Sequence, residues 1–316
     1  MAFSAKMICD SISPDRVRLS TMEVTFPRFV LAEFNTHRMF SRNSASSRAI
    51  PVEKTLKRIE SDPYIPIHWG QNQKGMQAEH EVSEDKKHHA EYLWLAAKES
   101  AMDSADRLLR CGIHKQIVNR ILEPFQWHTV IVTATEWSNF FALRSHPNAQ
   151  PEIRKISNII QKMMATNTPR VLSYGDWHTP FLSLDERNEY IKTMELTVGP
   201  NDNYFEYFPK WIDYLKKVSA GRCARVSYLT HDGKRDLQAD VDLCTRLQTS
   251  GHMSPLEHVA RPMTKEDAEI IVMNHLNSAG GLPDVNVSAT FSGNFRGWFQ
   301  FRKEFRHENN FAEVTK

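Results

Sequence analysis

The chain has 316 residues, of which 41% are hydrophobic and 25% are charged, and these fractions are ordinary for a packed globular protein. They argue against a disordered chain and against a membrane-spanning one. The 40 basic and 38 acidic residues nearly cancel, so no global field favours extended nucleic-acid or anionic-membrane contacts, and any phosphate recognition has to be local.

The N-terminal part predicts a strand, a helix and two polar loops. Residues 18–26 are rich in β-branched and apolar side chains and run into Pro27, which suits the first turn of a helix over residues 27–34. The hydroxyl-rich residues 41–47 are expected to form a loop. Residues 62–77 are interrupted by proline and glycine, so we expect an irregular segment there that acts as a lid or a binding loop.

The middle of the chain predicts mostly helices. Helical patterns cover residues 79–111, which end before a glycine that suits a C-cap, and residues 113–122. A β-rich run at 127–135 predicts a strand. It is followed by two more predicted helices, one over residues 136–144 and one, opened by a proline, over residues 151–164.

The C-terminal part has weaker periodicity. Residues 172–209 are expected to connect other elements through short helices, residues 220–229 to form a strand, residues 236–250 an amphipathic helix, and residues 288–301 a strand leading into a helix. Strands and long helices occur without a repeated β-α-β rhythm, which predicts the α+β class. A glycine-rich dinucleotide fingerprint is absent from the sequence, so a Rossmann motif is not expected.

Cysteine usage indicates a reducing compartment. The four cysteines contain no Cys-x-x-Cys pair, which favours free thiols over a disulfide framework or a zinc site. The N-terminus has no long apolar segment typical of a signal peptide. The sequence therefore predicts a cytoplasmic protein without a metal site. No cysteine is assigned a catalytic role, because the sequence shows no activating environment for a thiol.

Residues 36–48 form the most informative segment, which we call the Ser/Arg loop. It interleaves Arg38, Arg42 and Arg48 with asparagine and several serines. Guanidinium groups form bidentate, charge-assisted hydrogen bonds with phosphate oxygens, and serine hydroxyls and loop amides complete such a site. By composition alone, an exposed loop that binds no ligand is an equally good interpretation, because arginine-rich surface segments are common.

The spacing within this loop resembles a known signature. The run His37-Arg38, then Ser41, Asn43, Ser46 and Arg48, resembles the motif R-H-R-x-x-S/N-x-N-E-x-S-x-R of the flavin-dependent thymidylate synthases (ThyX). Two positions differ, because Thr36 stands where the family has its first arginine and Ser44 where it has glutamate. These two positions are where substrate and flavin recognition are expected to differ from the family.

Further matches follow in the family's order. Residues 139–144 (NFFALR) and 149–154 (AQPEIR) resemble the family's N-F-L-x-L-R and A-Q-x-E-I-R at the same separation. Arg120 and Pro124 match a family R-x-x-x-P element. The resemblance implies a ThyX-like α+β fold with an antiparallel sheet and long helices.

Two family elements that usually come early stand late in this chain. Residues 223–228 (CARVSY) and 251–258 (GHMSPLEH) resemble the family's A-A-R-V-S-Y and S-P-F-E-H. The order is either permuted, or a duplicated module has lost complementary parts in each half. We therefore expect a ThyX-like core over residues 1–200 and a second partial module over residues 201–316.

The resemblance implies roles for matched residues. His37, Arg38, Asn139 and His258 would contact FAD, and the nucleotide would be held by six residues: Ser44, Ser46, Ser47, Arg48, Arg120 and Arg144. Some have structural alternatives: Arg120 and Arg144 suit ion pairs at helix ends, and His258 suits a buried pair with Glu257.

The reaction that the resemblance implies is reductive methylation of dUMP at C5, with FAD, NADPH and methylenetetrahydrofolate as cofactors. Arg144 would polarise the uracil, because a permanent positive charge near a ring carbonyl stabilises developing negative charge. Ser46 would orient the base near the reacting carbon. These two residues are the predicted catalytic groups, in a site that the family builds between subunits, so we expect a homotetramer or a homodimer.

Two alternatives remain open from sequence. One is an enzyme that hydroxymethylates or otherwise modifies C5 of dUMP or dCMP, which the altered Thr36 and Ser44 make reasonable. The other is a protein that binds nucleotide or RNA without catalysis and keeps only the phosphate loop. The near-neutral net charge argues against extended contacts with nucleic acid.

Overall fold

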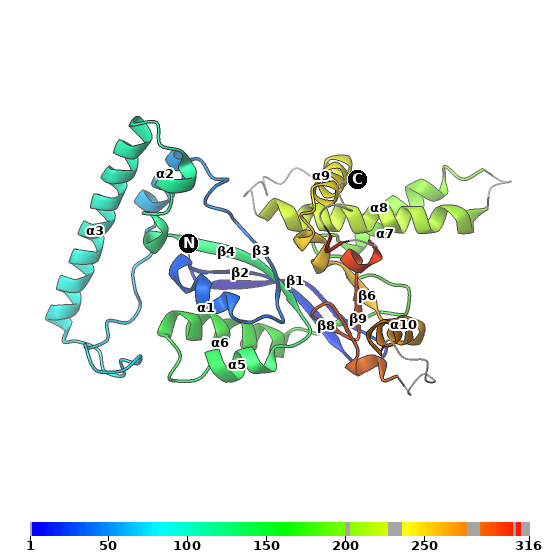
Figure 1. Cartoon of the computed structure of the whole chain (residues 1–316), viewed down its shortest axis with the longest axis horizontal. Helices are drawn as coiled ribbons and strands as arrows, with labels where there is room; N and C mark the ends of the chain where they lie inside the picture. Colours follow the sequence, from blue (N-terminus) through cyan, green and yellow to red (C-terminus); the bar gives the residue numbers. More distant parts are fainter. Residues whose placement is uncertain (1, 200–202, 227–235, 277–284, 306–307, 311–316) are drawn as a thin grey trace.

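A five-stranded sheet forms the centre of the molecule in the computed structural model, which describes residues 2–199, 203–226, 236–276, 285–305 and 308–310 (Figure 1). The strand order is β3-β4-β2-β1-β5. The long strands β1 (Ser4–Ile12), β2 (Arg18–Pro27) and β4 (Trp127–Ala134) are antiparallel. The short edge strand β3 (Ser41–Ser44) is antiparallel to β4, and β5 (Arg170–Val171) is parallel to β1.

One face of the sheet is apolar and carries a helical layer. Side chains alternate along a strand, so Met22 and Val24 of β2 and Val130 and Val132 of β4 share one buried face. The helices α5 (Ser138–Arg144) and α6 (Pro151–Thr166) cover this face, as Figure 1 shows below the strands. The short η1 (Arg28–Val30) and α1 (Leu31–Asn35) continue from β2 into the same core.

The opposite face is polar near the end of the sheet where the C-terminal segments pack. The 3-10 helix η4 (Ser254–His258) reaches this face, as does the antiparallel pair of strands β6 (Ala260–Pro262) and β9 (Trp298–Gln300). Trp298 donates from Nε1 to the Val17 carbonyl over 3.1 Å. The last third of the chain is thus bonded directly to the N-terminal hairpin.

A separate helical layer stands at the other end of the sheet. It consists of α2 (Val52–Ser61), the long α3 (Glu84–Arg110), α4 (Lys115–Val118) and η2 (Glu123–Phe125). In Figure 1, α2 and α3 lie on the left, far from α8 and α9. Their apolar core is distinct from the main one and comprises Val52, Ile59, Ala105, Val118, Leu122 and Phe125.

The remaining elements belong to the C-terminal half. The helices are α7 (Leu184–Glu195), α8 (Tyr204–Arg225), α9 (Leu237–Thr249) and α10 (Lys265–Leu276). Short elements follow, namely η5 (Val287–Ala289), β7 (Phe291–Ser292), β8 (Phe295–Arg296) and η6 (Phe301–Glu304).

Helices α8 and α9 pack closely because of one glycine and one buried ion cluster. A Cβ on Gly221 would lie 2.2 Å from the Asp240 carbonyl oxygen, so only glycine allows this approach. The Asp240 side chain is 2% exposed and accepts hydrogen bonds from Nε of Arg222 (3.0 Å) and Nε of Arg225 (2.5 Å). These bonds orient α9, which leads into η4.

The predicted α+β class with an antiparallel sheet is confirmed. The predicted strands at 18–26 and 127–135 match β2 and β4, and the helix expected over 151–164 matches α6. Within the described residues, no helix is both long enough and apolar enough to cross a membrane.

Three element predictions are wrong. The strand expected at 220–229 is the end of α8 through Arg225, because residues 220–224 are buried all round and a wholly buried helix loses its periodic pattern; residues 227–229 lie outside the described chain. The loop expected at 41–47 begins as strand β3, which pairs with β4. Only residues 115–118 of the helix expected at 113–122 are α-helical.

Candidate functional site

The Ser/Arg loop is held in shape from both sides. On one side, Nη1 of Arg42 donates to the carbonyls of Phe34 (3.2 Å) and His37 (3.4 Å). On the other, the buried Asn119 donates from Nδ2 to the carbonyls of Ser47 (2.7 Å) and Ile50 (2.9 Å). Arg42 is therefore committed to the backbone, and the turn that carries Ser46 and Arg48 is fixed by its neighbours.

A groove opens along this loop, and we call it the loop groove. Its volume is about 410 Å³, which falls within the range of ligand sites in proteins. One wall comes from the loop itself, with Ser44, Ser46 and Arg48, and the other comes from the C-terminal half, with His252 and Ser254. Segments about two hundred residues apart therefore meet here.

The guanidinium of Arg48 is available for a ligand. Arg48 is exposed, and its side chain has no hydrogen bond or ion pair within the described residues, although its backbone N–H donates to Ser46 Oγ over 3.3 Å. The side-chain amide of Gln116 and the hydroxyls of Ser44 and Ser254 line the same groove. The donor set suits an anionic group with several oxygens.

His37 and Arg144 lie together on the edge of the helical layer. Nε of Arg144 donates to Nε2 of His37 over 2.9 Å, and Nη2 donates to Oγ1 of Thr36 over 3.1 Å. Nε2 of His37 is thus an acceptor and the ring is neutral. Burial, and then the charges of Arg144 and Arg42, lower the pKa of His37 to about 4. Thr36, one of the two departures from the ThyX pattern, is a direct partner of Arg144.

The other predicted site residues lie in different surroundings. Arg38 and Asn139 are exposed, and their side chains have no partner within the described chain. Arg120 pairs with Glu123 over 2.8 Å, which is the ion pair that its position at a helix end suggests. Ser47 is buried and borders a different cavity from the one that Ser44 and Ser46 border.

Arg144 and Ser46, the two predicted catalytic residues, open onto separate hollows. Ser46 lines the loop groove, whereas Arg144 lines a second hollow of about 470 Å³ on helix α5 and the segment after it. The single chain does not bring the two side chains into one pocket.

His258 lies in the interior and not at a cofactor surface. It is 0% exposed, and its Nδ1 lies 2.7 Å from Oγ1 of Thr133. Thr133 contacts Oγ1 of Thr21 (2.6 Å), Thr21 contacts Nε2 of His178 (2.8 Å), and Nδ1 of His178 contacts Ser11 Oγ (2.9 Å). The alternative pairing of His258 with Glu257 is wrong, because Glu257 pairs with Arg302.

Burial determines the protonation state of the two histidines in this hydrogen-bonded network. Burial lowers the pKa of both His178 and His258 to about 3, so both rings are neutral. Nε2 of His258 is buried without a partner within the described residues. The network joins the sheet to η4 and so fixes the segment that delivers His252 and Ser254 to the groove.

The cysteines are not activated. Burial raises the pKa of Cys9 to about 11 and that of Cys244 to about 12, and it also raises the pKa of Cys223. Cys111, the residue after α3, is exposed. Cys9, Cys223 and Cys244 do not provide a thiolate nucleophile, because such a group needs a depressed pKa.

Sequence reasoning missed several groove residues. His252 and Ser254 belong to the late motif 251–258, from which only His258 was selected, and Gln116 lies in a segment without a motif. The late motif itself could have pointed to Ser254, because a short 3-10 helix exposes some of its side chains and buries others.

Fold and groove together define an α+β protein with a ligand-sized groove between a hydroxyl- and arginine-rich loop and a helical layer. Residues 16–170, just under half of the chain, match the profile of the family described as thymidylate synthase complementing protein (Thy1). The comparison with curated proteins gave no match.

Solved structures also resemble the chain. Two of them are crystal structures of a UMP/dUMP methylase, PolB, from Streptomyces cacaoi, bound with 5-Br dUMP and with 5-Br UMP. Each is 18% identical and has a TM-score of 0.44, with 52% of this chain covered in both. The alignments cover 90% of the first relative and 89% of the second.

Proposed function

We propose that this protein binds a pyrimidine deoxynucleotide, dUMP in the first instance, in the loop groove and modifies its base at C5. The observation that carries the proposal is the groove itself, which joins Ser44, Ser46 and Arg48 to His252 and Ser254. It unites two segments that resemble family motifs but stand far apart in the sequence. The match of residues 16–170 to the thymidylate synthase complementing protein profile supports the same reaction class.

Arg48 and the hydroxyls hold the phosphate in this proposal. A phosphate monoester offers oxygens that accept from a guanidinium fork and from serine hydroxyls. The free guanidinium of Arg48 supplies the charge, and Ser46, whose Oγ already accepts from the Arg48 amide, keeps its own proton to donate. Ser46 then lies beside the nucleotide and orients it.

Arg144 polarises the base only if two copies of the chain meet. Ser46 and Arg144 face separate hollows of one chain, so a site that uses both takes Arg144 from one copy and Ser46 from another. The proposed protein is therefore a homo-oligomer. Arg38 and Asn139, which are exposed and whose side chains bond to none of the described residues, fit the same arrangement, because unpaired donors at a surface suit an interface with a bound ligand.

The proposed cofactors are those of the family. In that chemistry FAD supplies hydride, methylenetetrahydrofolate the one-carbon unit, and NADPH the electrons that reduce the flavin. Arg38 and Asn139 fit a flavin, because both are exposed and offer a cation and an amide, whereas His37 is 7% exposed and has little surface to offer. His258 does not fit, because it has no exposed surface.

Titration of the purified protein with dUMP tests the binding step. Replacing Arg48 with glutamine should weaken dUMP binding by about tenfold or more, since a charge-assisted bond is lost. The matched control is Arg110→Gln, which removes an exposed arginine that pairs with Asp106 on α3. Equal affinity of the Arg48 variant and the native chain for dUMP would refute the groove as the phosphate site.

A further inference from the structure

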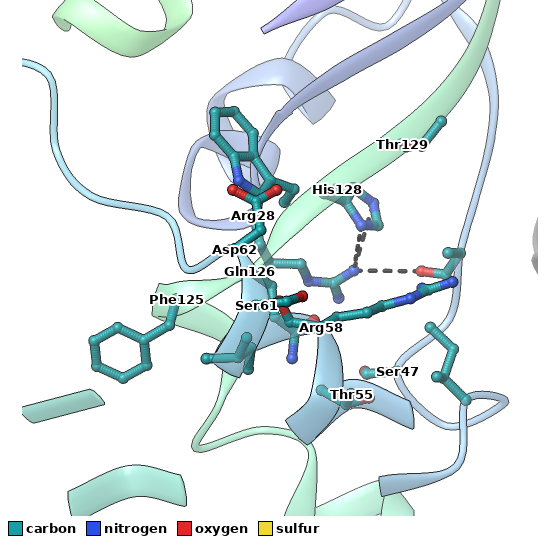
Figure 2. A pocket seen from close by; sticks show the side chains of 14 residues that line it. Arg28, Ser47, Thr55, Arg58, Ser61, Asp62, Phe125, Gln126, His128 and Thr129 are labelled. Carbon is teal, nitrogen blue, oxygen red and sulfur yellow. Dashed lines mark hydrogen bonds between the residues drawn. The ribbon is translucent and has the colours of Figure 1, made fainter. Parts of the chain in front are cut away.

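Another cavity, separate from the loop groove and from the hollow at Arg144, lies behind the Ser/Arg loop, and we call it the arginine pocket. Its volume is about 160 Å³, many times the ~10–15 Å³ that one water molecule occupies. It opens between helix α2, the start of β4 and the loop, and Figure 2 shows Arg28, Arg58, Ser47, Thr55 and His128 around it.

Arg28 is fixed at the wall of this pocket. Nη1 donates to Nδ1 of His128 (2.9 Å) and to the Ala45 carbonyl (3.3 Å), both drawn as dashed lines in Figure 2. Nη2 donates to Glu123 over 3.2 Å. Because His128 accepts this bond, its ring is neutral. Burial and then the charge of Arg28 lower its pKa to about 3, so His128 adds no positive charge.

Arg58 has no counter-charge of its own. It projects from α2 into the pocket with an extended side chain (Figure 2), and its guanidinium has no hydrogen bond or ion pair within the described residues. The residue is only partly exposed, and burial lowers its pKa. A partly desolvated cation without a partner is costly, and an anion in the pocket removes that cost.

The charge balance around the pocket favours a negative ligand. Glu123 is shared between Arg28 and Arg120, so one carboxylate serves two guanidinium groups. Asp62 also lines the pocket. Three guanidinium groups against two carboxylates leave one net positive charge. Among the residues that the structure describes, none forms a hydrogen bond with the Ser47 hydroxyl that would compete with a ligand oxygen.

We propose that the arginine pocket is a second ligand site, distinct from the loop groove, which binds an oxyanionic group, either a phosphate or a carboxylate. Arg58 is its principal anchor, Arg28 the fixed second cation, and Ser47 a hydroxyl donor. The loop separates the two sites, because Ser46 faces the groove and Ser47 the pocket. Two anionic ligands are therefore held on opposite sides of one loop.

Calorimetric titration with inorganic phosphate, and separately with glutarate, tests this site in the full chain saturated with dUMP. The native protein should bind at least one probe. Arg58→Gln should weaken that binding by about tenfold or more, and Arg58→Lys, which keeps the charge but loses the planar fork, by less. The matched control is Lys57→Gln, which removes an exposed cation from the same helix and should leave binding unchanged.

The two probes also show whether the natural ligand of the pocket carries a phosphate or a carboxylate. Binding of phosphate alone assigns the pocket to a phosphorylated ligand, and binding of glutarate alone assigns it to a carboxylate. Three results would overturn the proposal: neither probe binds at millimolar concentration, Arg58→Gln binds the probe as the native chain does, or the probe binds the dUMP-free chain but not the chain saturated with dUMP. The last result would make the pocket a part of the nucleotide site.

Discussion

Arg144 donates from Nε to Nε2 of His37 over 2.9 Å, although the two residues are 107 positions apart. The same guanidinium reaches Thr36. One arginine therefore ties the start of the Ser/Arg loop to the end of helix α5. The acceptor role of His37 keeps its imidazole neutral and leaves the positive charge on Arg144.

Replacing Arg144 with lysine tests this contact. An ammonium group cannot reproduce the planar fork that serves His37 and Thr36 together. We expect kcat/KM for the nucleotide to fall by about tenfold or more, with little change in the melting temperature because Arg144 is only half-buried. Arg107→Lys, an exposed position on α3, is the matched control. Unchanged turnover would remove Arg144 from the site.

Acid should destabilise the protein through its buried histidines. The pKa of each of His128, His178 and His258 is lowered to about 3 in the folded chain, whereas an unfolded histidine titrates near ~6.5. Below pH ~6.5 the unfolded chain binds protons that the folded chain excludes, so stability falls as the pH decreases toward 3, by up to about 1.4 kcal/mol per pH unit for each histidine.

Urea unfolding between pH 7 and pH 4 measures this slope. His258→Gln should make the free energy of unfolding less dependent on pH, because one proton-linked group is gone. His80→Gln, at an exposed position, should leave the slope as it is. A native protein whose stability is flat across this interval would contradict the neutral, buried state of these rings.

Gly221 should not tolerate a side chain. A Cβ there would lie 2.2 Å from the Asp240 carbonyl oxygen, and backbone cannot move aside as a flexible side chain does. Gly221→Ala should therefore destabilise the chain by about 1–3 kcal/mol in urea unfolding, despite the better helix propensity of alanine. Ser104→Ala, exposed on α3, should change stability little. A stabilised Gly221→Ala variant would show that α8 and α9 are not in close contact.

Mixing two impaired variants, assayed at a dUMP concentration at which each alone has little activity, tests whether the site spans two copies. In a dimer, Arg48→Gln chains refolded with Arg144→Ala chains should regain about a quarter of the native activity, because each mixed dimer rebuilds one intact site. Each variant refolded alone is the control. A mixture no more active than its components would place both residues in a site within one chain.

Local sequence patterns predicted the elements whose periodicity is clear. Strands β2 and β4 are rich in β-branched and apolar side chains and helix α6 begins at a proline, and their positions were predicted from those features. Strand β1 was missed, and residues 220–225 were misassigned because α8 is buried on all sides there. In such a segment tertiary packing determines the structure, and the local pattern carries no periodicity.

The site was predicted in part because the Ser/Arg loop and the late motif 251–258 carry recognisable residues. Their meeting in one groove depends on how α9 and η4 return to the sheet, which no local pattern encodes. Selecting His258 rather than His252 had the same cause, because the fold buries His258 in η4 and leaves His252, which precedes η4, exposed. Arg28 and Arg58 belong to ordinary-looking elements, and only the fold brings them to one cavity.

Incubation of the purified protein with dUMP, FAD, NADPH and methylenetetrahydrofolate, followed by mass analysis of the nucleotide, decides whether the protein modifies the base. We expect a product heavier than dUMP by one methylene unit, formed only when FAD is present, and lost in the Arg144→Ala variant. A hydroxymethylated product would support the proposed site and would replace methylation with hydroxymethylation as the reaction. Binding of dUMP without any modified nucleotide would contradict the proposal that this protein is a C5-modifying enzyme.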